Sequence, residues 1–186
     1  MRQTNGADII RTERLCLRPL QLEDTEALYR FASNREHTRY MIYYPHASIE
    51  ETRTFVEHAA EQWSSPKPEG LEFAVLSEGE LIGTVSLYFE GEPGEAELAW
   101  LLAPEACGKG YATEAAMALM KYAAEVWRAD RIIACCDSRN LASARVMERI
   151  GLTLEDAART REYPKTGEIS GELLYAKGID FLTLNC

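Results

Sequence analysis

The sequence lacks the features of several large protein classes. It has no apolar run of membrane-spanning length, and its first ten residues, MRQTNGADII, lack the apolar centre of a signal peptide. Its five cysteines and three histidines form no CxxC or mixed Cys/His metal spacing. Basic residues are outnumbered 20 to 30, giving a net charge of −10. We therefore expect a cytoplasmic protein with reduced thiols, bound to no metal, membrane or nucleic acid. The negative electrostatic field of such a protein attracts cationic substrates such as amines.

The length and composition predict one globular domain. The 186 residues, 46% of them hydrophobic, can form one domain with a substantial core but not two comfortable ones. We expect a flexible leader at residues 1–11, one domain at 12–180 and a tail at 181–186.

Hydrophobic periodicity predicts a mixed order of strands and helices. Apolar patterns indicate strands at 14–20, 71–76, 81–89, 95–103, 131–136, 152–163 and 171–177. Helical spacing indicates helices at 21–33, 48–63, 112–128 and 140–151. Ser48 and Glu51 form a capping box, and Asn140 can cap the last helix. Hairpins followed by two strand–helix units predict an α/β sheet of mixed direction.

The stretch from Glu95 to Ala124 reads as strand, glycine turn and helix. Gly108 and Gly110 precede a helix whose first backbone N–H groups have no intrahelical partners. Such a turn can hold a phosphate or pyrophosphate, with Lys109 as a screening charge. The simple alternative is a connection that uses glycine for positive φ. The complete GxGxxG and Gly-Lys-Ser/Thr fingerprints are absent.

Three separated motifs, in this order, resemble the GCN5-related N-acetyltransferase (GNAT) superfamily, and more closely its RimJ/RimL-like branch of ribosomal-protein N-terminal acetyltransferases. They are Thr12–Arg18, Gly108–Ala115, and Asn140–Ser143 with Val146–Gly151. The resemblance covers nearly the whole chain. It implies a GNAT-like, mostly antiparallel twisted sheet of about seven strands flanked by about four helices.

The resemblance implies acetyl-CoA as co-substrate, no metal and an amine acceptor. The residues it assigns to acetyl-CoA are Leu101, Leu102, Cys107, Gly108, Lys109, Gly110, Tyr111, Ala112, Thr113 and Asn140. Aromatic residues that could shape the amine pocket are Tyr44, Trp63, Tyr163 and Tyr175. The alternative for these four is an ordinary place in the core.

Two positions depart from the superfamily pattern. Cys107 replaces the polar residue that opens the superfamily's turn, and Met147 stands where many relatives have a tyrosine that acts as general acid. The resemblance offers Glu97 as general base, against a merely solvated strand residue. Ser143 is the candidate acid, against a helix-capping or structural hydroxyl.

The sequence thus predicts an N-acetyltransferase that moves an acetyl group from acetyl-CoA to a primary amine by direct attack in a ternary complex. The acceptor is a protein N-terminus or, alternatively, a small-molecule amine such as a polyamine, amino acid or amino-sugar. A non-catalytic CoA-binding module remains a second alternative, given Met147. A monomer or a homodimer is expected.

Overall fold

The computed structural model describes residues 9–89 and 91–179 and contains one eight-stranded sheet in the order β1-β2-β3-β4-β5-β6-β8-β7. The strands are β1 Ile10–Arg11, β2 Cys16–Pro19, β3 Gly70–Ser77, β4 Glu80–Tyr88, β5 Glu95–Leu102, β6 Arg131–Asp137, β7 Thr153–Tyr163 and β8 Glu168–Gly178. The α-helices of this part of the chain are α1 Thr25–Ala32, α2 Ile49–Ser64, α3 Tyr111–Trp127 and α4 Leu141–Arg149. The predicted mixed, mostly antiparallel α/β fold is confirmed.

Several boundaries differ by one to three residues from the sequence-based expectation, and two differences change the kind of element. Ile10 and Arg11 lie within the expected leader but form β1, because they pair with Leu17 and Cys16 of β2. The helix expected from residue 21 begins as a single 3₁₀ turn, Leu22–Asp24, before α1. The rest of the expected leader, at 1–8, and the expected tail, at 181–186, lie outside the described residues.

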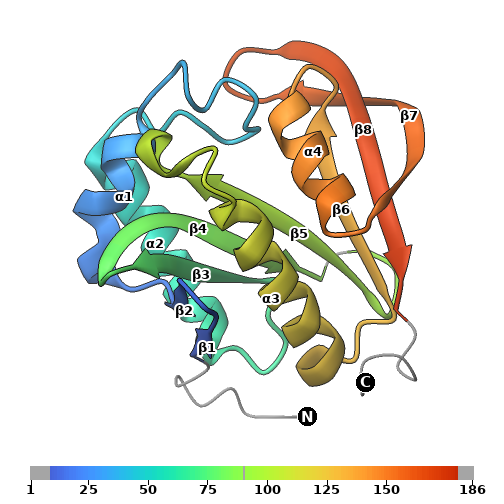
Figure 1. Ribbon diagram of the computed structural model, residues 1–186. Helices are drawn as coiled ribbons and strands as arrows, with labels where there is room; N and C mark the ends of the chain where they lie inside the picture. The colour runs from blue at the N-terminus through green and yellow to red at the C-terminus, as the bar shows by residue number, and fades with distance from the viewer. Residues whose placement is uncertain (1–8, 90, 180–186) are drawn as a thin grey trace.

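The helices divide between the two faces of the sheet. In Figure 1, α3 crosses the front of β3, β4 and β5 with α4 beside β6, while α1 and α2 lie behind. The front core contains Phe73, Leu87 and Leu98 with Leu119 of α3, all at most 1% exposed. The rear core includes Leu28 of α1 and Val56 of α2, both fully buried. The strands β3 and β4 are therefore covered on both faces.

The sheet divides between β5 and β6. These strands are parallel, and they pair only at Glu95–Arg131, Ala96–Ile132 and Glu97–Ile133. Beyond Glu97, β5 continues beside β4 to Leu102, and β6 continues beside β8 to Asp137. The two strands separate in this direction, as Figure 1 shows. One edge of β5 is thus left without a neighbouring strand among the described residues.

Candidate active site

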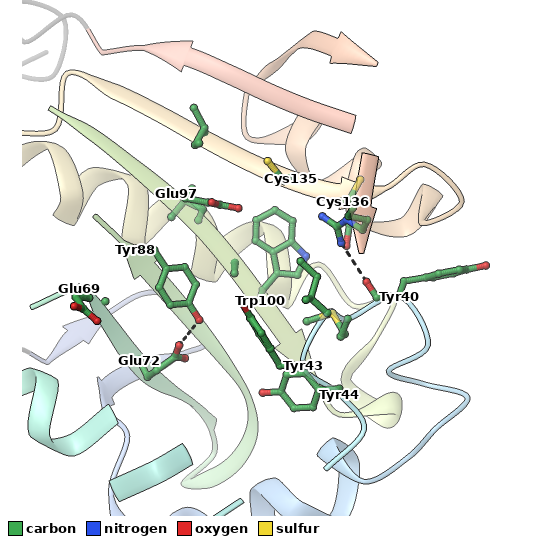
Figure 2. A pocket seen from close by; sticks show the side chains of 18 of the residues that line it. Tyr40, Tyr43, Tyr44, Glu69, Glu72, Tyr88, Glu97, Trp100, Cys135 and Cys136 are labelled. Carbon is green, nitrogen blue, oxygen red and sulfur yellow. Dashed lines mark hydrogen bonds between the residues drawn. The ribbon is translucent and has the colours of Figure 1, made fainter. Parts of the chain in front are cut away.

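A cavity of about 600 Å³ lies where the two strands separate. Residues from both faces of the sheet line it: Tyr40–Tyr44, the inner side of α2, the start of β3, Tyr88, the β5 stretch from Glu97 to Trp100, Cys135 and Cys136 of β6, and part of α4. In Figure 2, Glu97, Trp100 and Tyr88 reach this space from the sheet, and the tyrosines approach it from the connecting segment. The cavity therefore joins the two faces at the gap.

Glu97 is the last residue of β5 that pairs with β6, so it lies where these two strands separate, and it lines the cavity. Burial raises the pKa of its carboxyl, and the negative charge of Glu172 raises it further. Arg161 and a hydrogen bond from the Cys135 thiol oppose this rise in part. A carboxylate with a raised pKa is a better proton acceptor near neutral pH, which is what a general base requires.

The open edge of β5 presents backbone groups to the gap. The N–H of Ala103 donates to the Ile82 carbonyl at 2.8 Å, which sets the alternation of hydrogen bonds along the β4–β5 pair. Because bonding direction alternates from residue to residue, the N–H groups of Trp100 and Leu102 point away from β4. Consistent with this, the Leu102 carbonyl lies 2.6 Å from Nε2 of His37, on the side opposite β4. The Trp100 N–H is thus directed towards the side on which β5 has no strand partner.

The turn predicted to be an anion cradle lies at the start of α3 and has the backbone geometry that such a site requires. Gly108 and Gly110 have left-handed φ angles of 76° and 82°, and Gly110 is the N-cap residue. The first intrahelical bond is donated by Glu114 to the Gly110 carbonyl at 3.0 Å. The N–H groups of Tyr111, Ala112 and Thr113 consequently face out of the helix end, where the helix dipole adds positive potential. The exposed turn at Cys107–Lys109 precedes them.

Arg14 lies beside this cradle, and the sequence analysis did not identify it. Its guanidinium donates to the Lys109 carbonyl at 3.0 Å, forms an ion pair with Glu114 at 2.6 Å and lies 4.6 Å from the centre of the Tyr111 ring. The side chain is 44% exposed, so its charge can reach a bound phosphate. Arg14 stands about 95 positions from the glycine turn, so only the folded chain brings them together.

The residues of α4 approach the cavity from the front face. Asn140 accepts a hydrogen bond from the Ser143 N–H at 3.2 Å, so it caps α4 as expected. Asn140, Ser143 and Met147 all line the cavity. Met147 is 1% exposed, and its thioether cannot donate a proton. The base candidate on β5 and the acid candidate on α4 therefore border one space.

The four predicted pocket aromatics have different environments. Tyr44 lines the cavity and stacks on His46, with ring centres 4.5 Å apart. The other three do not border it. Trp63 donates from Nε1 to the Glu72 carbonyl at 3.0 Å within the core, and the hydroxyl of Tyr175 lies 3.4 Å from Glu148. Tyr163 donates to Asp137 at 2.6 Å, and burial raises its pKa to about 12.

The structure adds lining residues that the sequence analysis passed over, chiefly Glu72, Tyr88, Trp100 and Tyr40. Glu72 had one visible signal, since it is the single charge in the run Leu71–Leu76. A charge in a strand covered on both faces is unusual. Tyr40 belongs to the tyrosine-rich segment, whose backbone accepts a 3.5 Å hydrogen bond from Arg161 of β7.

The cysteines at 16, 107, 135 and 136 are free. Burial raises the pKa of the Cys135 thiol to about 12, and the charges of Glu97 and Glu172 act in the same direction. Within residues 9–89 and 91–179, no three His, Cys, Asp or Glu side chains form a group that could hold a metal ion. No helix in that part of the chain is both long enough and apolar enough to span a bilayer.

Comparison with known proteins agrees with this architecture. Residues 14–153 match the family model described as the acetyltransferase (GNAT) domain. The uncharacterized N-acetyltransferase YnaD of Bacillus subtilis is 31% identical over 169 residues, covering 90% of this chain and 95% of YnaD. The spermidine N(1)-acetyltransferase of Escherichia coli K12 is 28% identical over 141 residues, covering 75% and 73% of the two chains.

Among solved structures, the ribosomal L7/L12 α-N-protein acetyltransferase RimL, in complex with coenzyme A, superposes with a TM-score of 0.82. The sequences are 24% identical, and the match covers 93% of this chain and 99% of RimL. This similarity concerns the fold.

The chain belongs to the GNAT acetyltransferase family. It is an acyltransferase that transfers acetyl groups to amines, with acetyl-CoA as the donor. The open edge of β5 and the glycine-lined start of α3 are chemically suited to such a donor, because both present backbone N–H groups for a thioester carbonyl and phosphates.

Proposed function

We propose that the acceptor is a primary amine on a small cationic molecule, and that Glu97 removes its proton. The observation that carries the proposal is the lining of the cavity. Of the four glutamates that border it, Glu69 is exposed and Glu95 is paired with Arg131 at 2.8 Å, whereas Glu72 and Glu97 form no ion pair with a basic side chain among the described residues. The single arginine among the described lining residues is Arg161. That arginine is already paired with Glu172 at 2.9 Å. The acidic surroundings favour a cation over a neutral or anionic acceptor.

The reaction follows from the groups around the gap. The ammonium form of the acceptor loses a proton to Glu97, directly or through a water molecule, and the free amine nitrogen attacks the carbonyl carbon of the thioester. The Trp100 N–H is the proposed donor to the carbonyl oxygen, which gains negative charge. The carbon–sulfur bond then breaks, and the nitrogen, positively charged after the attack, loses its second proton, which replaces the proton that the departing sulfur takes up. Ser143 is the proposed proton donor to the departing thiolate, which can also leave unaided because thiols have a pKa of about 8.5.

A second candidate acceptor is a protein N-terminus. The resemblance of three sequence motifs to the RimJ/RimL-like branch favours it. The two acceptors need different sites. A protein N-terminus has only one certain positive charge, and the site must also leave room for the polypeptide that follows it. The cavity is bordered on one side by Tyr40–Tyr44, and this segment is anchored by Arg161 and by Lys165, which donates to the Pro45 carbonyl at 2.6 Å. This anchored border supports a small acceptor.

Thiol release from acetyl-CoA, measured with a panel of amines, tests the proposal. The panel contains alkyl monoamines, diamines, polyamines, amino-sugars, amino acids and peptides with free N-termini. We expect kcat/KM for the small cationic amines to exceed that for peptides by at least tenfold. Preference for a peptide would instead establish the N-terminal acceptor. Tight CoA binding without turnover of any amine would establish a non-catalytic CoA-binding module.

The proposed proton transfers are tested by Glu97→Gln and Ser143→Ala. Glu97 accepts a proton only when ionised, so the rate should rise with pH through its raised pKa. Glu97→Gln should reduce the rate by about 10²–10⁴ at neutral pH and recover in part at high pH, where more amine is already neutral. Ser143→Ala should cost less. An unchanged pH profile for Glu97→Gln, with normal acetyl-CoA affinity, would show that Glu97 is not the base.

A further inference from the structure

Glu72 is a buried carboxylate without an ionic partner. Its residue is 6% exposed, and it lines the cavity. No lysine, arginine or histidine forms an ion pair with it in the part of the chain that the structure describes. Burial raises the pKa of the carboxyl, so its negative charge is expensive for the folded protein. A buried carboxylate that destabilises the folded protein and faces a cavity indicates that a cationic ligand compensates its charge there.

The side chain is held in place by two neutral donors. The hydroxyls of Ser86 and Tyr88 both donate to the carboxylate, Tyr88 at 2.5 Å (Figure 2). Gly70 makes room for this arrangement, because a Cβ atom at that position would lie 2.5 Å from Cδ1 of the Tyr88 ring. The ring of Tyr88 therefore extends over β3 to reach Glu72. The carboxylate is fixed by groups that leave its charge unneutralised.

Sheet register places Glu72 on the same face as Glu97. Glu72 is opposite Ser86, and Tyr88 is opposite Glu97. Since opposed residues and those two positions apart share a face, both carboxylates project to the side covered by α2. Because β4 lies between their strands, the two residues are two interstrand spacings and two positions apart, which corresponds to about 12 Å between Cα atoms.

We propose that Glu72, fixed by Ser86 and Tyr88, binds a second cationic group of the acceptor while Glu97 serves the amine that reacts. The acceptor is then a diamine or polyamine whose positive charges are separated by a short chain. Aromatic rings from Tyr44 and Tyr88 border the space that the connecting chain crosses. This inference rests on the proposed small-amine acetyltransferase function and specifies its substrate class.

The test compares two acceptors that differ only at the distal end, 1,4-diaminobutane and 4-aminobutan-1-ol. Both present the same reacting amine, but only the first has a second ammonium group. With the unmodified protein, we expect kcat/KM to be at least tenfold higher for the diamine, well above the twofold advantage of having two equivalent amines. With Glu72→Gln, the ratio should fall to about three or less, chiefly through a higher KM for the diamine. Turnover of the amino alcohol should stay within about threefold.

Two further variants control the interpretation. Glu69→Gln makes the same charge change at an exposed residue bordering the same cavity, and it should alter the ratio by less than threefold. Tyr88→Phe leaves the charge of Glu72 but removes one of its donors, so it should lower the ratio by an intermediate amount. This second variant also provides the test if Glu72→Gln does not fold. Acetyl-CoA affinity, measured by calorimetry for each variant, reports whether the donor site is intact.

The outcomes separate this inference from the proposed function. Equal turnover of the diamine and the amino alcohol by the unmodified protein would overturn the inference and leave small-amine acetylation standing. An equal loss with both acceptors in Glu72→Gln would also overturn it, since the residue would then have a structural role. Equal effects of Glu69→Gln and Glu72→Gln would attribute the preference to the general acidic field. Absence of turnover with every small amine would defeat the proposed function itself.

Discussion

Gly110→Val tests whether the start of α3 binds the phosphates of acetyl-CoA. Gly110 has φ +82°, in the left-handed region that costs other residues about 1–2 kcal/mol. A Cβ atom there would lie 3.4 Å from Nη2 of Arg14, which is an ordinary contact. Strain therefore comes from the backbone, and its relief turns the first N–H groups of α3 away from the ligand. We expect the Kd for acetyl-CoA to rise at least tenfold, or about 1.4 kcal/mol.

Gly167→Val provides the matched control for this measurement. Gly167 has φ +71°, lies between β7 and β8, and has no atom within 4 Å of an added Cβ. Both variants carry similar backbone strain, so thermal denaturation should report comparable losses of stability. Calorimetric titration with acetyl-CoA should show weak binding for Gly110→Val alone. Near-normal affinity in a folded Gly110→Val protein, or equal weakening in both variants, would refute the assignment of the cradle.

Two other substitutions test Cys107, in the turn before α3, and Asp137, at the end of β6. Cys107→Ser should leave the transfer rate within a few-fold, because this exposed turn is expected to act through its backbone and not through the sulfur. Loss of transfer in a folded variant that still binds CoA would indicate a role for the sulfur. Asp137→Asn should destabilise the protein by about 1–3 kcal/mol, since its fully buried carboxylate accepts hydrogen bonds from Arg139 and Tyr163. Burial opposes ionisation of Asp137, but these donors hold its pKa well below its usual range, so this stabilisation should persist above the ordinary Asp pKa of about 3.9 and fade as the pH falls below it. Denaturant titrations at neutral and acidic pH measure the difference, and a gap that did not change with pH would contradict this origin.

The local elements of this fold could be predicted because their signals are local. Ser48 accepts from the Glu51 N–H at 3.3 Å, as the capping box indicates, and α2 begins at the next residue. The strand, glycine turn and helix from Glu95 onward depend on periodicity and on the conformations open to glycine. The order of the strands was not predicted, because pairing between distant segments has no local signal; the resemblance supplied only the mostly antiparallel character of the sheet.

The arrangement of the acceptor pocket depends on contacts that the sequence does not display. Trp63 and Tyr163 could each have faced an open space, but their polar atoms bond to Glu72 and Asp137 instead. Glu72 could be taken for a solvated residue until β4 and α2 are placed around β3. Tyr88 reaches it only because Gly70 has no side chain, a relationship across two strands. A pocket formed by contacts between different strands can be predicted only when the register of strand pairing is known.

The short pairing of β5 with β6 has a consequence for how the molecule holds together. The sheet consists of two wings, β1 to β5 and β6 to β7, joined by the short pairing of β5 with β6. Arg131 of β6 bridges this junction through its ion pair with Glu95 of β5 at 2.8 Å, and it also pairs at 2.6 Å with Glu155 of β7 in its own wing. An acetyl-CoA molecule bound along the open edge of β5 would contact both wings and restrict their relative motion. Bound acetyl-CoA should therefore slow hydrogen exchange in the outer wing of β6, β8 and β7 as well as in the residues it contacts.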